Sequence, residues 1–321
     1  QRQSFINAIT AAMAMGCSTN AIIHLVAIAR RAGHDVGLDD FEDQSRRVPV
    51  IANIRPNGDK YLMYDFYRAG GLRAMLNRIT PHLDGSCLTV NGKTLGENIA
   101  DTEAIDDKIV KTLETPMYPE GGLAMLNGSL APDGAVIKQS AASPELLHHT
   151  GRAVVFESYE DLHARIDDDD LDVTKDDVLV LKSAGPVGGP GIPEWGMLPI
   201  PKKLLEQGIR DMVRISDARM SGTAFGTVVL HISPESALGG PLGLVQNGDM
   251  IELDVEGRRI DLLVDDAEME RRKAAWVAPA PRYTRGYGLM FSEHVMQAQY
   301  GCDFDFLVGN DPVETHAEMH A

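Results

Sequence analysis

The N-terminal part of the chain has the apolar pattern of buried helices joined by a buried strand. Residues 4–15 (SFINAITAAMAM) contain no helix breaker and are rich in Ala, Met and Ile, which predicts a buried helix. Ser18 or Thr19 can cap a second helix, TNAIIHLVAIARRAG, which Gly33 closes. VPVIANI at 48–54 is almost continuously apolar, and this pattern predicts a strand covered on both faces. This part of the chain therefore has an α/β character.

The pattern changes to short apolar stretches beyond about residue 86. A charged stretch at 101–119, with Pro116 and Pro119 near its end, is typical of a linker. Strands are expected at 134–138, 152–157, 177–182, 211–216 and 226–233. Two further apolar runs flank Glu256 and Gly257 as in a β-hairpin. Short helices are expected at 159–165, 201–207 and 265–276. Short strands at this spacing predict a barrel-like or sandwich β domain with flanking helices.

Charge and composition exclude several classes of function. Lys and Arg number 30 against 47 Asp and Glu in 321 residues, so the formal net charge is −17. Binding to nucleic acid or anionic lipid depends on Lys and Arg, so neither partner is expected. No run approaches the roughly 18 apolar residues of a membrane span. Three cysteines cannot form an even disulfide framework, which favours a reducing, cytoplasmic setting.

The first candidate site is a loop rich in Gly and Pro at 185–196, GPVGGPGIPEWG. Such a sequence forms neither strand nor helix, and it is typical of a loop held close to a ligand or to another segment. Glu194 is its only acidic residue. Carboxylate oxygen is a ligand that Mg²⁺ prefers, so Glu194 is a candidate metal ligand. The alternative is an exposed loop carboxylate without a function.

The second candidate site is SDARMSGTAFG at 216–226, which lies between two expected strands. Small hydroxyl residues and glycines after a strand suit the binding of an anion by backbone N–H groups. The segment contains neither a Walker phosphate loop nor the Gly-x-Ser-x-Gly elbow of hydrolases. Ser221 is therefore either a functional hydroxyl or a turn residue.

Histidines and cysteines add little to the candidate chemistry. His148 and His149 are adjacent, which is not the spacing of a helical metal pair. His24 lies in an apolar helix and is most simply a core residue. The three cysteines are distant in sequence: Cys17, Cys87 and Cys302. None has the local CxxC spacing of zinc or iron–sulfur sites, so we expect no cluster ligand in this chain.

Several long motifs resemble one enzyme family. They are, in order, GCSTNAIIHLVAIARRAG, VPVIANIRPNGDKYLMYDFYRAGGL, GSLAPDGAVIKQSAAS, GRAVVFES, GPVGGPGIPEWGMLP, VRISDARMSGTAFGTVVLHISPES and GGPLGLVQNGDMIELDV. They cover nearly the whole chain and resemble the dihydroxy-acid and phosphogluconate dehydratases. SDARMSGTAFGTVVLH resembles the sugar-acid branch of that family, the pentonate dehydratases for L-arabinonate or D-xylonate.

The resemblance implies a reaction and roles for three residues. The reaction is the dehydration of a 2,3-dihydroxy sugar acid to its 2-keto-3-deoxy acid. Ser221 matches the base that removes the C2 proton, Thr223 matches a neighbouring active-site threonine, and Glu194 matches a ligand of Mg²⁺. The family also carries an iron–sulfur cluster, expected to be [2Fe–2S], which acts as the Lewis acid. Its members are homodimers or homotetramers.

One departure from the family concerns its cluster. The cluster cysteines and the other Mg²⁺ ligands of the family lie upstream of the motif that contains Cys17, and Cys17 stands where the family usually has glycine. We therefore expect residues 1–115 to be the C-terminal remnant of the α/β cluster-binding domain plus a linker, and residues 116–321 to be the β-barrel-like domain. Two alternatives remain: a dihydroxy-acid dehydratase of branched-chain amino-acid synthesis, and an inactive truncated relative.

Overall fold

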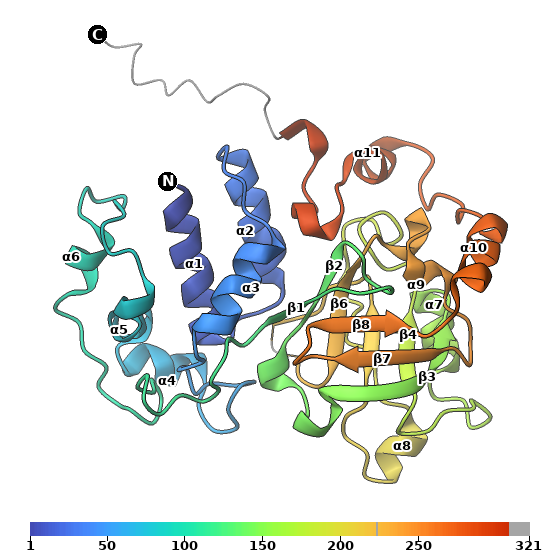
Figure 1. Cartoon of the computed structure of the whole chain (residues 1–321), viewed down its shortest axis with the longest axis horizontal. Helices are drawn as coiled ribbons and strands as arrows, with labels where there is room; N and C mark the ends of the chain where they lie inside the picture. The colour runs from blue at the N-terminus through green and yellow to red at the C-terminus, as the bar shows by residue number, and fades with distance from the viewer. Residues whose placement is uncertain (223, 308–321) are drawn as a thin grey trace.

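The N-terminal part is a group of helices. The computed structural model describes residues 1–222 and 224–307. The helices of this part are α1 (Arg2–Met15), α2 (Asn20–Arg31), α3 (Leu38–Arg47), α4 (Met63–Arg68), α5 (Gly71–Arg78) and α6 (Leu95–Ile99). Figure 1 shows them on one side of the molecule, with α2 and α3 next to the strands. The first two helices confirm the prediction from the apolar pattern.

These helices share one hydrophobic core with part of the strand region. Ile9, Met13 and Phe41 are completely buried and belong to the same cluster as Val228 and Leu230. Burial of such side chains contributes roughly 1.5–3 kcal/mol each. The N-terminal helices are therefore packed against the sheet by apolar contacts.

The prediction of a strand at 48–54 is wrong. Val50 and Ala52 form only isolated bridges, to Tyr118 and Val110. Ile51 instead donates its N–H to the carbonyl of Ala14, at the end of α1. The run is apolar because it is buried between loops and a helix end. Burial alone produces the same continuous pattern as a central strand.

The remaining strands form one mixed sheet. Its members are β1 (Ala124–Leu126), β2 (Gly134–Ile137), β3 (His148–Phe156), β4 (Val178–Leu181), β5 (Arg214–Ser216), β6 (Val228–Ser233), β7 (Met250–Asp254) and β8 (Arg259–Leu262). The order is β1-β2-β6-β5-β4-β3-β7-β8. The four strands β6, β5, β4 and β3 are parallel to one another. A bridge between Asn127 and Arg259 links the first strand to the last. The sheet is therefore a nearly closed barrel, as expected.

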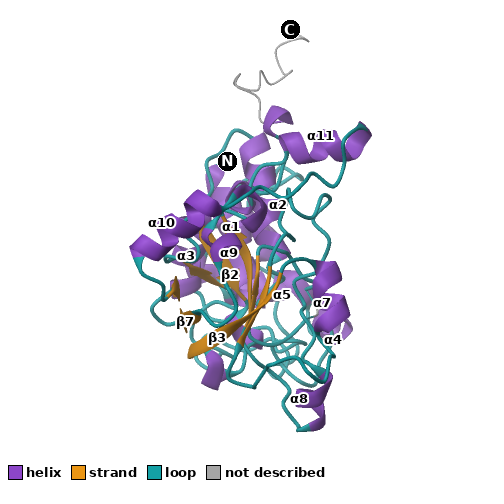
Figure 2. Ribbon diagram, turned by 90° about the vertical axis from the view of Figure 1, so that its right-hand side faces the viewer, coloured by secondary structure: helices purple, strands orange, loops and turns teal. Residues whose placement is uncertain are grey.

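Short helices flank this barrel, as Figure 2 shows. They are α7 (Tyr159–Arg165), α8 (Lys202–Glu206), α9 (Pro241–Leu244), α10 (Asp266–Ala275) and α11 (Gly286–His294). Among the described residues, no helix combines the length and the apolar character needed to cross a membrane.

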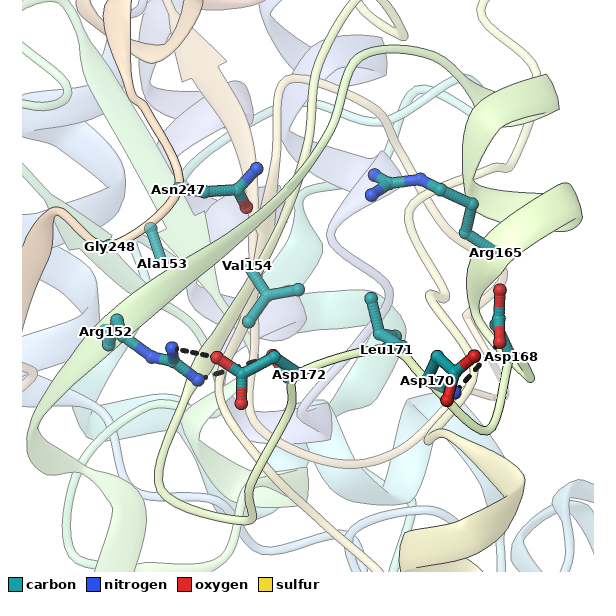
Figure 3. Close-up of a pocket in the computed structure, with 10 residues that line it drawn as sticks. All are labelled: Arg152, Ala153, Val154, Arg165, Asp168, Asp170, Leu171, Asp172, Asn247 and Gly248. Carbon is teal, nitrogen blue, oxygen red and sulfur yellow. Dashed lines mark hydrogen bonds and ion pairs between the residues drawn. The ribbon is translucent and has the colours of Figure 1, made fainter.

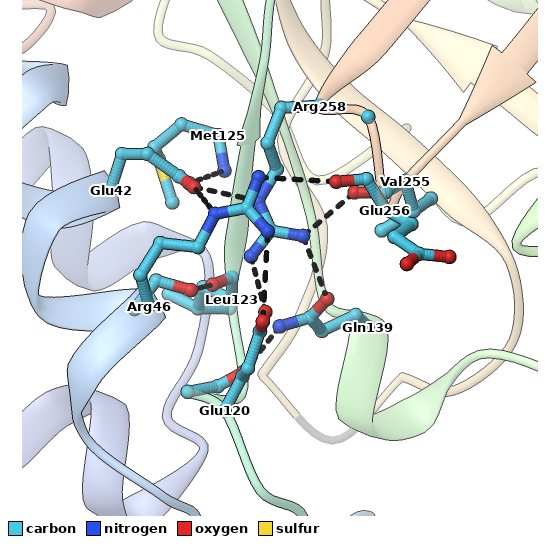
Figure 4. Close-up of polar contacts among 12 residues, drawn as sticks. Glu42, Arg46, Glu120, Leu123, Met125, Gln139, Val255, Glu256 and Arg258 are labelled. Atoms are coloured by element: carbon cyan, nitrogen blue, oxygen red, sulfur yellow. Dashed lines mark hydrogen bonds and ion pairs between the residues drawn. The ribbon is translucent and has the colours of Figure 1, made fainter.

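Arg258, in the turn between β7 and β8, links the barrel to the N-terminal helices. Its guanidinium contacts Glu42 of α3 at 2.7 Å and Glu120 at 2.6 Å (Figure 4). Arg46 of α3 also contacts Glu42 at 2.7 Å. Only 10% of the Arg258 side chain is exposed. This network adds charged contacts to the apolar interface.

A candidate active site between two loops and a helix start

The two candidate loops leave the same edge of the sheet. β4 and β5 are parallel neighbours, and their last residues, Leu181 and Ser216, are paired. The loop that contains Glu194 follows β4, and the loop that contains Ser221 follows β5. Crevices at the carboxyl ends of adjacent parallel strands are common ligand sites. The topology therefore brings together two segments that the sequence separates.

Asn20, the first residue of α2, connects the two loops. Its Nδ2 donates to Glu194 Oε1 at 3.2 Å and to the carbonyl oxygen of Met220 at 3.0 Å. Met220 directly precedes Ser221. One amide therefore contacts the candidate metal ligand and the backbone next to the candidate base.

Close packing between neighbouring segments also fixes the start of α2 against the two loops. A Cβ on Gly222 would lie 2.8 Å from Ser18 Cβ, and one on Gly196 would lie 2.8 Å from the carbonyl oxygen of Arg219. Gly196 donates its N–H to that carbonyl at 2.8 Å. Of the two predicted caps, Thr19 is the residue that precedes α2, but its side chain makes no capping bond. Ser18 Oγ instead accepts the N–H of Asn20 at 3.2 Å.

Two buried carboxylates fix the segments in which the two loops leave the sheet. Asp217 accepts the N–H of Ala184 at 3.1 Å, and it also accepts both the N–H and the hydroxyl of Ser236. Glu235 accepts the N–H groups of Val187 and Gly188. Burial, with a further contribution from the charge of Asp217, raises the pKa of Glu235 to about 7. Burial also raises the pKa of Asp217.

Positive charge lies beside Glu194. Arg219 Nη1 is 3.9 Å from Glu194 Oε1, and Arg219 Nε donates to the carbonyl of Ile192 at 2.6 Å. Burial, followed by the charges of Arg219 and His24, lowers the pKa of His231 to about 3, so this imidazole is neutral. The expectation that His24 is a core residue is wrong. Its side chain lies on the exposed face of α2, where it lines a pocket with Arg219.

The predicted site residues have different exposures. Glu194 keeps 42% of its side chain exposed, and Ser221 is also exposed. Trp195 stacks on Tyr159 with ring centroids 4.7 Å apart, which anchors the loop beside Glu194. Thr223 lies outside the residues that the structure describes.

The cysteines remain apart from any metal-binding group. All three are free, and within 1–222 and 224–307 no three His, Cys, Asp or Glu side chains are arranged to hold a metal ion. Burial raises the pKa of Cys17 to about 11 and that of Cys302 to about 12.

A separate pocket lies beside the second half of β3 (Figure 3). Arg152, Arg165, Asp172 and Asn247 are among its lining residues. Arg152 is paired with Asp172 at 2.5 Å. This pocket of about 320 Å³ contains none of the predicted site residues.

Two family descriptions match consecutive parts of the chain. The dihydroxy-acid/6-phosphogluconate dehydratase N-terminal description matches residues 1–98, and the corresponding C-terminal description matches residues 108–302. The chain belongs to the dihydroxy-acid/6-phosphogluconate dehydratase family. The resemblance derived from the sequence motifs is thereby confirmed.

Individual relatives carry the names of two kinds of dehydratase. The chain is 50% identical over 310 residues to the 6-deoxy-6-sulfo-D-gluconate dehydratase of Pseudomonas putida. It has the same identity over the same length to the L-arabinonate dehydratase of Rhizobium leguminosarum bv. trifolii. Each match covers 96% of this chain and 53% of the relative. A dihydroxy-acid dehydratase of Chromohalobacter salexigens is 45% identical over 309 residues, 95% of this chain and 53% of the relative. The chain thus spans about half the length of these curated relatives.

Sequence reasoning missed Asn20, Arg219 and the buried carboxylates Asp217 and Glu235. Asn20 had one available signal, because it lies at the expected start of a helix inside the motif GCSTNA. The carboxylates had none, since neither the loops that they join nor their burial can be read from spacing.

Proposed function

We propose that the gene product containing this chain is a hydro-lyase that dehydrates a sugar acid to its 2-keto-3-deoxy acid. The observation that carries the proposal is the contact of Asn20 with both Glu194 and the residue before Ser221. The names of the relatives add support, because sulfogluconate and arabinonate dehydratases match at 50% identity.

The proposed chemistry begins at Ser221. Its hydroxyl, as the alkoxide, takes the proton from C2 of the substrate. The electrons of the C2–H bond form a C2–C3 double bond, the C3–O bond breaks, and the departing hydroxide takes the proton now held by Ser221 and leaves as water. The resulting enol loses the proton of its C2 hydroxyl, gains one at C3 and becomes the ketone. A serine alkoxide requires stabilisation by nearby positive charge and N–H donors, and Arg219 lies in the same loop.

Glu194 is the residue proposed to hold Mg²⁺. Its carboxylate is partly exposed, and the buried Oδ1 of the adjacent Asn20 has no hydrogen-bond partner among the described residues. A carboxylate oxygen matches the preference of Mg²⁺, which usually binds one or two protein carboxylates and keeps several waters, and Asn20 Oδ1 is a free acceptor for such a water. When bound, the ion supplies positive charge for the carboxylate end of the substrate.

The described residues do not fit an iron–sulfur cluster, because no group of three potential ligands is present among them. We derive no step through a cluster. The [2Fe–2S] cofactor and the homodimeric or homotetrameric assembly remain part of the proposal as implied by the family resemblance, and the cytoplasmic setting remains part of it because of the cysteine content.

A second candidate substrate is a branched 2,3-dihydroxy acid, because relatives at 45% and 43% identity are named dihydroxy-acid dehydratases. Both substrates undergo the same elimination. Assays of one preparation of the whole gene product with a pentonate and with a branched dihydroxy acid separate the two. Preferred turnover of the branched acid would overturn the sugar-acid proposal, and no turnover of either would favour an inactive relative.

The Ser221→Ala variant tests the role of the base. We expect turnover to fall by about a hundredfold or more, the range for removing a general base. Ser86→Ala is the control, because Ser86 is exposed and its hydroxyl donates to Asp84 in its own turn. Wild-type turnover in Ser221→Ala would remove Ser221 from this role.

A further inference from the structure

We propose that Asn20 is a positioning residue that fixes Glu194 for Mg²⁺ and presents its own carbonyl oxygen to the bound ligand. The proposal rests on the proposed function of Glu194. It concerns a residue in α2, outside both candidate loops.

The orientation of the Asn20 amide is determined by its partners. Nδ2 lies 3.2 Å from a carboxylate oxygen of Glu194 and 3.0 Å from the backbone carbonyl oxygen of Met220. Both partners only accept hydrogen bonds, so the donating nitrogen must face them. Oδ1 therefore points away from these two acceptors.

Oδ1 is buried and has no hydrogen-bond partner within the described parts of the chain. A buried acceptor without a donor is unfavourable, and its presence in a native structure requires a reason. Oδ1 is one of four buried side-chain atoms in this state among the described residues; the others are Thr19 Oγ1, Arg30 Nε and His231 Nε2. A bound ligand that carries an O–H group would supply the donor that Oδ1 lacks. Both a substrate hydroxyl and a metal-bound water have this chemistry.

The backbone of Asn20 is held in place by its neighbour. Ser18 Oγ accepts the Asn20 N–H at 3.2 Å, and the Ser18 side chain lies against Gly222. The side-chain amide of Asn20 is therefore attached at a fixed position relative to the loop that contains Ser221. Arg219 also approaches Glu194 Oε1, but at 3.9 Å, and its Nε is engaged by the carbonyl of Ile192. Asn20 is the nearer partner, and it orients the carboxylate without neutralising the charge that a cation needs.

The test compares Asn20→Ala, Asn20→Gln and the matched control Asn247→Ala in the whole gene product. Asn247 also makes a side-chain hydrogen bond to backbone, accepting the N–H of Val155 at 2.7 Å, but it lies in the separate pocket of Figure 3. The first measurement is the dissociation constant of Mg²⁺ alone by calorimetry. We expect Asn20→Ala to raise it about tenfold, as for other groups that orient metal ligands. Asn20→Gln keeps an amide on a longer side chain and should fall between Asn20→Ala and the wild type.

The second measurement is the split between kcat and KM at saturating Mg²⁺. A raised KM in Asn20→Ala identifies a substrate hydroxyl as the donor to Oδ1, and an unchanged KM with weakened Mg²⁺ binding identifies a metal-bound water. A purely structural role would change the melting temperature while leaving Mg²⁺ affinity as in Asn247→Ala, and this result overturns the proposal. If Asn20→Ala does not fold, an unchanged Mg²⁺ constant in Asn20→Gln overturns it equally.

The two proposals can fail separately. A wild-type protein that binds Mg²⁺ but dehydrates no 2,3-dihydroxy acid refutes the proposed function, while the calorimetric comparison still decides the role of Asn20. A wild-type protein that binds no Mg²⁺ overturns the metal role of both Glu194 and Asn20.

Discussion

Arg214 and Asp211 form a buried ion pair at the start of β5, beside the residue at which the loop that contains Ser221 ends. Arg214 Nη2 lies 2.8 Å from Asp211 Oδ1, with 1% and 10% of the two side chains exposed. Asp211 also accepts the N–H and the hydroxyl of Thr227, where the loop returns to the sheet. The pair therefore holds the start of β5 against the end of the loop at Thr227, where β6 begins.

Asp211→Ala should lower the free energy of unfolding by about 3–5 kcal/mol, because it leaves the Arg214 charge buried and unpaired. Asp172→Ala is the control, since Asp172 is 81% exposed although it also contacts an arginine. Its removal should change the free energy by about 0–1 kcal/mol. Urea unfolding of both variants measures the difference, and equal losses would contradict the assigned role of the buried pair.

Gly222→Ala should separate α2 from the loop that contains Ser221. Its new Cβ would lie 2.8 Å from Ser18 Cβ, and such overpacking costs about 1–3 kcal/mol. Adding Ser18→Gly removes the obstructing side chain and should restore most of the loss. The interaction energy of a double-mutant cycle, from thermal or urea unfolding, measures this coupling. Additive effects of the two changes would show that the contact is not strained.

The titration of Glu235 should make stability depend on pH in a defined direction. Its pKa is raised from 4.5 to about 7 by burial first and by Asp217 second. Since the folded state holds this proton more tightly than the unfolded state, the stabilisation is fully present below pH 4.5 and is lost as the pH rises through about 7.

Glu235→Gln removes this titration and is the matched variant. The difference in unfolding free energy between the wild type and Glu235→Gln should decrease as the pH rises across that window. Melting curves of both proteins along a pH series provide the measurement. A difference that is constant with pH, or that grows, would contradict the raised pKa.

Arg258→Ala should weaken the link between α3 and the barrel. Loss of its charged hydrogen bonds to Glu42 and Glu120 is expected to lower the unfolding free energy by about 1.5–3 kcal/mol. Arg259→Ala is the control, because this neighbouring arginine is 61% exposed and contacts only Asp261 among the described acidic residues. Its loss should be below about 1 kcal/mol. Similar losses in both variants, measured by urea unfolding, would argue against a specific role of Arg258.

The local sequence pattern was sufficient to predict some elements of the fold and insufficient to predict others. The helix expected at 4–15 is α1, because a continuous run of good helix formers needs no distant partner to be recognised. The run at 48–54 was misassigned because its partners are a helix end and a loop, and an apolar sequence reports burial without reporting what covers it. His24 was misassigned for a related reason, since helical position alone did not reveal which face α2 exposes.

The sequence by itself determined the family and the two loops that carry Glu194 and Ser221, because composition and motif order are local properties of the chain. Only the tertiary structure decided that these loops meet, since the parallel pairing of β4 with β5 places both at one edge of the sheet. It also selected Asn20 as the group between them and enclosed Asp217 and Glu235 beneath them. Burial, hydrogen bonding and pKa depend on neighbours that are distant in sequence, and the fold alone brings those neighbours together.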